Sequence, residues 1–165
     1  MNTVKLRAAT ETDLSSINSI YDHYVISSAC TYQIEKTADS ARLDWFRKHG
    51  PLHPVTVAVD DSDIIGWGSL SSFHDREAYA KTVENSIYVR PDRLRRGIGG
   101  RILADLIERA RQLGHHTIIA GIDSGQTGSI ALHEKFGFTE AGRLREVGFK
   151  FGKWLDVVYL QLILN

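Results

Sequence analysis

The N-terminal third of the chain has hydrophobic residues spaced as in amphipathic helices. Residues 4–8 alternate and predict a short strand, after which Thr10 or Thr12 is placed to cap a helix. A second short helix is predicted over 37–48, because Gly50 and Pro51 follow it as a stop. The residues expected to face the core are Leu14, Ile17, Ile20, Tyr24 and Val25 in the first helix and Leu43 and Phe46 in the second.

From Val55 onwards the pattern changes to strands. β-Branched residues on either side of the sequence DDSD predict a hairpin over 55–70. The later segments alternate between strand and helix patterns, with a strand over 82–89, a helix over 98–113, a strand over 117–122, a helix over 127–136 and two strands within 138–164. The sequence therefore predicts an α/β fold of the α+β type with a mostly antiparallel sheet.

Composition narrows the class of protein. With 165 residues, 42% of them hydrophobic and 24% charged, the chain is expected to form a single globular domain over residues 1–165. Twenty basic and twenty acidic side chains give zero net charge, which argues against a nucleic-acid partner. The single Cys30, the absence of a signal peptide and the lack of a long apolar run predict a cytoplasmic protein with no membrane partner.

A glycine-rich turn precedes the helix over 98–113. Successive backbone N–H groups of such a turn, together with a helix N-terminus, form a cradle for an anion such as a pyrophosphate. The sequence RRGIGG over 95–100 matches neither the Walker motif nor the dinucleotide fingerprint, and a tight connection with surface arginines is the alternative. The net charge of +4 over residues 90–101 favours the anion site; it comes from Arg90, Arg93, Arg95, Arg96 and Arg101 less Asp92.

Three blocks of sequence resemble the GCN5-related N-acetyltransferase (GNAT) superfamily, and more closely its phosphinothricin acetyltransferase branch. They are TVENSIYVRPDRLRRGIGGRILADLI over 82–107, SIALHEKFGF over 129–138 and VGFKFGKWLD over 147–156. The resemblance implies a central mixed sheet of about seven strands flanked by about four helices, with acetyl-CoA as co-substrate. Two positions depart from the pattern, because Leu94 stands where Gln or Arg is usual and Gln126 where Asn is usual.

Acetyl transfer to an amine requires a base and a means to stabilise the leaving thiolate. Glu84 is the candidate base, because a carboxylate within a largely apolar strand is expected to have a raised pKa. The alternative for Glu84 is a solvated edge residue or a salt-bridge partner. By the resemblance, His133 lies where many family members have a tyrosine that protonates the leaving thiolate. His133 would either protonate the thiolate or donate a hydrogen bond to the cofactor. The alternative is that its ring only forms hydrogen bonds with neighbouring residues of the helix.

The resemblance also implies a set of contacts to acetyl-CoA. The backbone of residues 87–89 would pair with the pantetheine like an added strand, and the glycine turn would hold the pyrophosphate. The candidate cofactor-binding residues are Ile87, Tyr88, Val89, Arg95, Arg96, Gly97, Ile98, Gly99, Gly100, Gln126, Ser129 and His133.

The irregular segment 71–81 supplies the first candidate for substrate recognition. Arg76 is suited to pair bidentately with an amino-acid carboxylate. Core packing is the alternative for each aromatic candidate. The candidates for the wall and the closure of the pocket are Tyr32, Phe73, Tyr79, Lys150 and Trp154. No metal site is expected, because HEKFG is not the zinc signature HExxH and DDSDIIG lacks the later ligands of a calcium loop.

These observations predict an acetyl-CoA-dependent N-acetyltransferase that acts directly, in a ternary complex, on the α-amine of a small amino acid. The resemblance implies substrates such as phosphinothricin, methionine sulfoximine or methionine sulfone. Acetylation of a protein N-terminus or another amine, and a non-catalytic acyl-CoA-binding regulatory module, are the alternatives. The apolar run over 157–164 and the resemblance suggest a homodimer, although a buried strand would give the same run.

Overall fold

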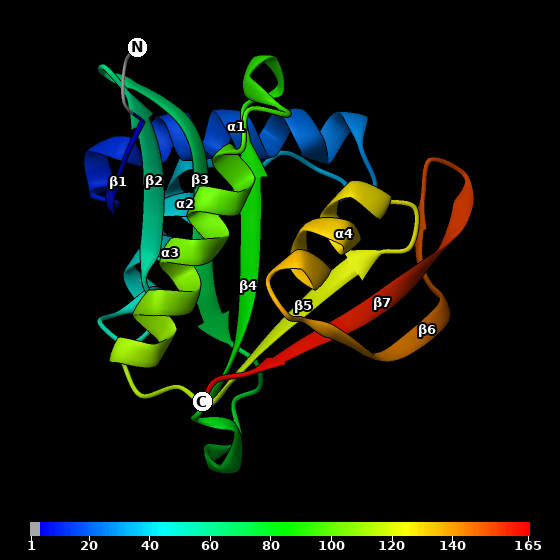
Figure 1. Ribbon diagram of the computed structural model, residues 1–165. Coiled ribbons are helices and arrows are strands. Elements are labelled where there is room, and N and C mark those ends of the chain that lie inside the picture. The colour runs from blue at the N-terminus through cyan, green and yellow to red at the C-terminus, as the bar shows by residue number, and fades with distance from the viewer. Residues whose placement is uncertain (1–3) are drawn as a thin grey trace.

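The strand-forming segments assemble into one seven-stranded sheet in the computed structural model, which describes residues 4–165 (Figure 1). The strands lie in the order β1-β2-β3-β4-β5-β7-β6. Their bounds are β1 Lys5–Ala8, β2 Val55–Asp60, β3 Asp63–Ser72, β4 Thr82–Val89, β5 Thr117–Asp123, β6 Thr139–Lys150 and β7 Lys153–Ile163. The predicted order of elements and the mixed, mostly antiparallel sheet are confirmed.

Among the described strands, one pair of neighbours, β4 and β5, is parallel, and that pair separates. β4 and β5 are in register only over Thr82–Glu84 and Thr117–Ile119. β4 is paired with β3 over Val83–Val89, whereas its residues 85–89 have no strand partner on the β5 side within the described chain. Figure 1 shows the two strands diverging from their common lower end. The divergence opens the sheet at its centre.

Four helices cover the two faces of the sheet (Figure 1). α3 (Ile98–Gln112) and α4 (Thr127–Lys135) lie on one face, and α1 (Leu14–Ser27) and α2 (Asp39–His49) on the other. The apolar stripe of α3 is buried and packs on β2, β3 and β4. At Gly68 of β3 a β-carbon would lie 2.5 Å from Ile102, so this glycine allows α3 to approach the sheet closely.

The α1–α2 face differs in detail from the prediction. α1 begins at Leu14 after a short 3₁₀ turn, and Thr10 and Asp13 form a capping box before it. In α2 the predicted inward residues Leu43 and Phe46 are only half-buried. The one buried residue of α2 is Arg42, whose exposed fraction is 4%. Apolar periodicity missed it, because that pattern assigns charged residues to the solvent side.

The β6–β7 hairpin forms one end of the molecule (Figure 1). The apolar run over 157–164 is partly internal, since Val158 and Leu160 of β7 and Leu164 just after it are buried. Among residues 4–165, no helix is long and apolar enough to cross a membrane.

Candidate functional site

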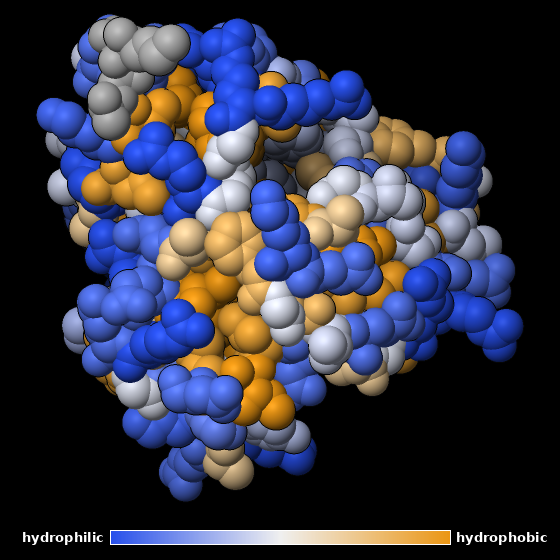
Figure 2. Space-filling view, in the orientation of Figure 1, coloured by the Kyte–Doolittle hydropathy of each residue, from blue (hydrophilic) through white to orange (hydrophobic). Residues whose placement is uncertain are grey.

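A cleft of about 850 Å³ occupies the opening between β4 and β5. Its walls come from β4, the loop before α3, β5 and α4. Along residues 85–89 the edge of β4 that faces this opening has no neighbouring strand in the described chain, and the backbone groups on that edge belong to the alternate residues Asn85, Ile87 and Val89. An extended ligand can therefore pair with β4 as an added strand. Figure 2 shows apolar surface in the middle of the face that carries α3 and α4, with hydrophilic side chains around it.

The glycine turn forms the upper wall of the cleft. Arg95 and Gly97 have positive φ angles of 59° and 75°, so the chain turns sharply before α3 begins at Ile98. The N–H groups of Ile98, Gly99 and Gly100 precede the first helical hydrogen bond, and no side chain caps them. These free amides and the helix dipole have the geometry of an anion cradle, and the binding of a pyrophosphate there stays a prediction.

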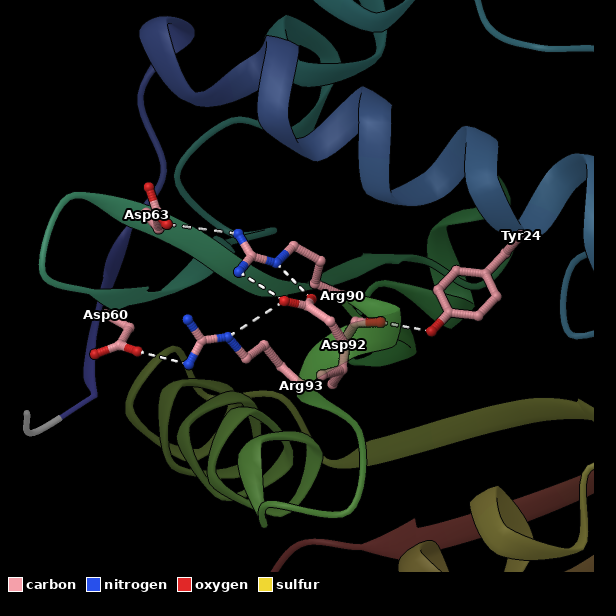
Figure 3. Close-up of polar contacts among 7 residues, drawn as sticks. Tyr24, Asp60, Asp63, Arg90, Asp92 and Arg93 are labelled. Carbon is pink, nitrogen blue, oxygen red and sulfur yellow. Dashed lines mark hydrogen bonds and ion pairs between the residues drawn. The ribbon is translucent and has the colours of Figure 1, made fainter.

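Most of the arginines near the turn form ion pairs or hydrogen bonds with other parts of the chain, as Figure 3 shows for Arg90 and Arg93. Arg90 pairs with Asp92 at 2.7 Å and with Asp63 at 3.7 Å, and Arg93 pairs with Asp60 at 2.9 Å. Arg101 donates to the carbonyl of Val4. The local charge of +4 is thus partly neutralised by aspartates from the β2–β3 hairpin. Among the described residues, the remaining pair, Arg95 and Arg96, forms no ion pair, and only Arg95 lines the cleft.

Glu84 lies where β4 and β5 separate. Its side chain is half-buried and lines the cleft, 3.3 Å from where a β-carbon on Gly121 would be. Burial raises the pKa of Glu84 above its usual value, and nearby His74 partly offsets this. The carboxylate forms no salt bridge or hydrogen bond with any side chain between residues 4 and 165. Its environment therefore suits a proton acceptor better than the salt-bridge partner considered as the alternative.

His133 of α4 is fully engaged by hydrogen bonds. Its Nδ1 lies 2.8 Å from the Ser129 carbonyl, so Nδ1 carries the proton and donates it. Its Nε2 then accepts from the Asn85 amide at 2.9 Å. Burial lowers the pKa of His133, which is 3% exposed, so the neutral ring is favoured. The expected hydrogen-bonding neighbours are therefore present, and one of them is on β4.

Two tyrosines, one from α1 and one from the loop after it, reach the cleft. Tyr24 of α1 donates to the carbonyl of Val89 at 2.5 Å, and burial raises its pKa to about 12 (Figure 3). Tyr32 lines the cleft and donates to Asp123 at 2.8 Å. Its ring packs against Gly148 of β6, where a β-carbon would be 2.5 Å away. The Tyr32 ring can approach β6 this closely because residue 148 has no side chain.

The other predicted substrate residues lie outside the cleft walls. Lys150 is buried and donates to the carbonyls of Ser28 and Thr31 at 2.7 and 2.8 Å, so its amine anchors the loop that carries Tyr32. Arg76 is exposed. The remaining aromatic candidates contact one another or neighbouring rings: Phe73 and Tyr79 pack together with His74, and Trp154 with Phe149.

The predicted cofactor residues converge on the cleft. All of them line it except Arg96, whose side chain is exposed. The contacts predicted from the resemblance remain predictions, but the structure brings these residues together. Leu94 and Gln126, the two departures from the family pattern, also line the cleft.

A second cavity, of about 270 Å³, was not expected from the sequence. It lies between the sheet and the α1–α2 layer and is called the Arg42 cavity below. Ser86 and Tyr88 line both this cavity and the cleft. The only sequence signal for this cavity is the alternation in GWGSLSS over 66–72, which places the side chains of Trp67, Ser69 and Ser71 on one face of β3. Its walls are Tyr21, Gln33, Thr37, Arg42, Trp45, Trp67, Ser69, Ser71, Ser86 and Tyr88.

Comparisons with known proteins agree with this geometry. Residues 17–138 match the model of the acetyltransferase (GNAT) family. A methionine sulfoximine/methionine sulfone acetyltransferase of Salmonella typhimurium is 35% identical over 97% of this chain and 94% of its own. An L-amino acid N-acyltransferase of Escherichia coli is 33% identical over 98% and 95%. A crystal structure of a phosphinothricin acetyltransferase from Sinorhizobium meliloti with acetyl-CoA superposes with a TM-score of 0.95, at 36% identity over 99% of this chain and 89% of the other.

Proposed function

The chain belongs to the acetyltransferase (GNAT) family and is an acyltransferase, and from this we propose that it acetylates the α-amine of a small amino acid or analogue. The proposed substrates are of the methionine sulfoximine, methionine sulfone and phosphinothricin type, as the relatives' names state for those proteins. The observation that carries the proposal is the central cleft, with Glu84 where its two strands separate and free amides at its upper wall.

The cleft fits acetyl-CoA. The uncapped amides of residues 98–100, with Arg95 beside them, would hold the pyrophosphate, and the free edge of β4 over 87–89 would pair with the pantetheine arm. Gln126, which precedes α4, and Ser129 in its first turn would contact the same ligand. When bound, acetyl-CoA supplies the acetyl thioester that the amine attacks.

Glu84 would accept the proton from the substrate ammonium group, either directly or through one water. Its raised pKa brings it closer to the pH at which an amine must be deprotonated. His133 is better suited to orient Asn85 than to donate a proton, because its neutral ring already donates to Ser129 and accepts from Asn85. We therefore propose a positioning and hydrogen-bonding role for His133.

Direct transfer is favoured over an acyl-cysteine route. Cys30 lines the cleft, but burial raises the pKa of its thiol. A thiol with a raised pKa is a poor nucleophile at neutral pH. The amine is thus the better acceptor of the acetyl group in a ternary complex.

The test is a thiol-release assay with acetyl-CoA and each of the three amino acids, with mass spectrometry of the product. We expect turnover on at least one of them and a mass increase of one acetyl group on its amine. The N-acetylated amino acids, which lack a free amine, serve as matched controls and are expected to release no thiol. Turnover on peptide N-termini or other amines with none on the amino acids would contradict the proposed substrate class.

The exposed apolar side chains of the β6–β7 hairpin support a homodimer. The proposed occupant of this surface is a second copy of the chain, because a cluster of exposed aromatic and aliphatic residues is typical of a subunit interface. These residues are about half exposed or more: Leu144, Val147, Phe149, Phe151 and Trp154. We further propose that residues 1–165 act as one catalytic domain in the cytoplasm.

A further inference from the structure

Arg42 is a buried cation without an anionic partner. Its Nε donates to Asn18 at 3.1 Å and its Nη2 lies 3.4 Å from the Thr37 hydroxyl. Within residues 4–165 no carboxylate forms an ion pair with it. The acidic side chains nearby are occupied elsewhere, since Asp22 accepts from the Thr37 backbone at 3.0 Å and Asp39 from Asn18 at 3.4 Å. A buried charge that lacks a counter-ion is costly, so the protein retains it for a reason other than stability.

Aromatic rings hold the guanidinium in place. Its central carbon lies 4.7 Å from the ring centroids of both Tyr21 and Trp45, and 5.8 Å from that of Trp67. Cation–π contacts of this kind stabilise the charge and fix the plane of the group, but they leave N–H donors free. The guanidinium is thus pre-organised, and burial lowers its pKa in the absence of an anion.

The Arg42 cavity offers a second free donor. The indole Nε1 of Trp67 is buried and has no hydrogen-bond acceptor in the described chain. Trp67 and Arg42 line the same cavity, together with the hydroxyl-bearing Ser69 and Ser86. Unpaired donors in a desolvated site favour a ligand that brings acceptor oxygens and negative charge.

The Arg42 cavity adjoins the cleft that contains the candidate base Glu84. Ser86 and Tyr88 belong to both the cavity and the cleft, and Ser86 lies two residues from Glu84 on β4, so their side chains share a face of the strand. A volume of about 270 Å³ is near the lower end of small-molecule sites. A small amino acid with its amine at Glu84 can therefore extend into it.

We propose that the Arg42 cavity binds an oxyanionic group of the amino-acid substrate, with Arg42 as its counter-charge and Trp67 as an additional donor. This inference rests on the proposed function. The group is either the α-carboxylate or the phosphinate of a substrate such as phosphinothricin, since both present the paired oxygens that a guanidinium recognises. Arg76, the candidate from the sequence for the same kind of group, is exposed and lines neither the Arg42 cavity nor the cleft.

The test compares Arg42→Met with Arg47→Met. Methionine fills much of the arginine volume between the aromatic rings, and Arg47 is on the same helix but exposed and paired with Glu11. For Arg42→Met we expect the KM for the amino acid to rise by about 10- to 100-fold, the range of a lost hydrogen bond to a charged group. The KM for acetyl-CoA should stay within about twofold, and Arg47→Met should leave both constants unchanged.

Two further amines identify the group that is bound. If Arg42 binds the α-carboxylate, the loss persists with L-methionine and disappears with 3-(methylsulfonyl)propylamine, which has no carboxylate. If it binds the phosphinate, the loss occurs with phosphinothricin and disappears with L-methionine. An unchanged KM for every amino acid in a folded Arg42→Met protein overturns the inference.

Binding without turnover separates this inference from the proposed function. Calorimetric titration of the amino acid into the protein saturated with CoA requires no acetyl transfer. If the wild-type protein binds the amino acid without acetylating it, and Arg42→Met abolishes that binding, the cavity is supported and the proposed function is rejected. If the wild-type protein acetylates the amino acid and Arg42→Met leaves turnover unchanged, the proposed function is supported and the cavity is rejected. If Arg42→Met does not fold, Arg42→Lys keeps the charge but not the bidentate fork, and its KM is expected to rise by about 10-fold; an unchanged KM would equally reject the inference.

Discussion

At the scale of single residues, Glu84 is the group of the cleft whose role is tested most directly, because its carboxylate is half-buried and forms no ion pair among the described residues. Its carboxylate has a raised pKa because desolvation disfavours the charged form. Below that pKa the group is protonated and accepts no proton, so the rate should fall as the pH is lowered through it. Glu84→Gln is expected to lower kcat by about 100-fold or more and to abolish this acidic limb.

The same change should leave cofactor binding and the fold intact. Because the folded state raises the pKa of Glu84, it binds more protons than the unfolded state, and this residue makes the protein less stable as the pH rises through the affected range. Glu84→Gln is therefore expected to unfold at an equal or higher temperature at neutral pH, with an unchanged Kd for acetyl-CoA. A variant that retains the wild-type pH–rate profile would rule out the role as base.

At the scale of elements, the contact between β6 and the loop that carries Tyr32 shapes the cleft. A β-carbon at position 148 would lie 2.5 and 2.7 Å from two atoms of the Tyr32 ring. Gly148→Ala is expected to displace the ring, weaken its hydrogen bond to Asp123 and raise the KM for the amine by about 10-fold, with a stability loss of about 1–3 kcal/mol. Steady-state kinetics and thermal unfolding measure the two effects.

Gly142→Ala is the matched control for that prediction. Gly142 lies in the same strand, β6, and a β-carbon there meets nothing within 4 Å. It should leave the KM unchanged and stability within about 0.5 kcal/mol. Equal effects of the two substitutions would show that strand propensity, and not the Tyr32 contact, is responsible.

The helices and strands could be predicted from the sequence, whereas several features of the site could not. Period and capping signals predicted the order of strands and helices, since these depend on local spacing. The glycine turn and Glu84 could be predicted as parts of a site because each is unusual in its local context. The separation of β4 from β5 did not follow from period or capping signals, because it depends on the pairing of strands that are distant in sequence, and only the family resemblance implied a free strand edge at 87–89. Arg42 was missed for a similar reason: its burial depends on the rings of Tyr21 in α1 and Trp67 in β3, which are distant in sequence, together with Trp45 of its own helix.

At the scale of the whole molecule, the zero net charge conceals an uneven distribution. Arg90 and Arg93 are held by aspartates and serve the fold, whereas Arg95 and Arg42 remain free for ligands on opposite sides of β4. The co-substrate and the amino acid would each meet a cation without a competing carboxylate. Two small sites, one before α3 and one under α2, explain how a neutral protein would bind two ligands that each carry an oxyanionic group without general affinity for polyanions.

The β6–β7 hairpin connects this arrangement to assembly. Phe149 and Trp154 pack on each other at 5.1 Å between ring centroids, yet each is more than half exposed. Trp154→Glu would place a charge in the proposed subunit interface without touching the buried core. Light scattering is expected to give a dimer mass for the wild type and a monomer mass for this variant.

Lys153→Glu provides the matched control, because Lys153 is the exposed neighbour of Trp154 and the change is also to glutamate. It is expected to remain dimeric. Gly148, which supports Tyr32, lies in the same hairpin, so loss of the dimer should also raise the KM for the amine as the hairpin loses its support. A wild-type protein that is monomeric at every concentration, or a Trp154→Glu variant that stays dimeric, would contradict the hairpin as the interface.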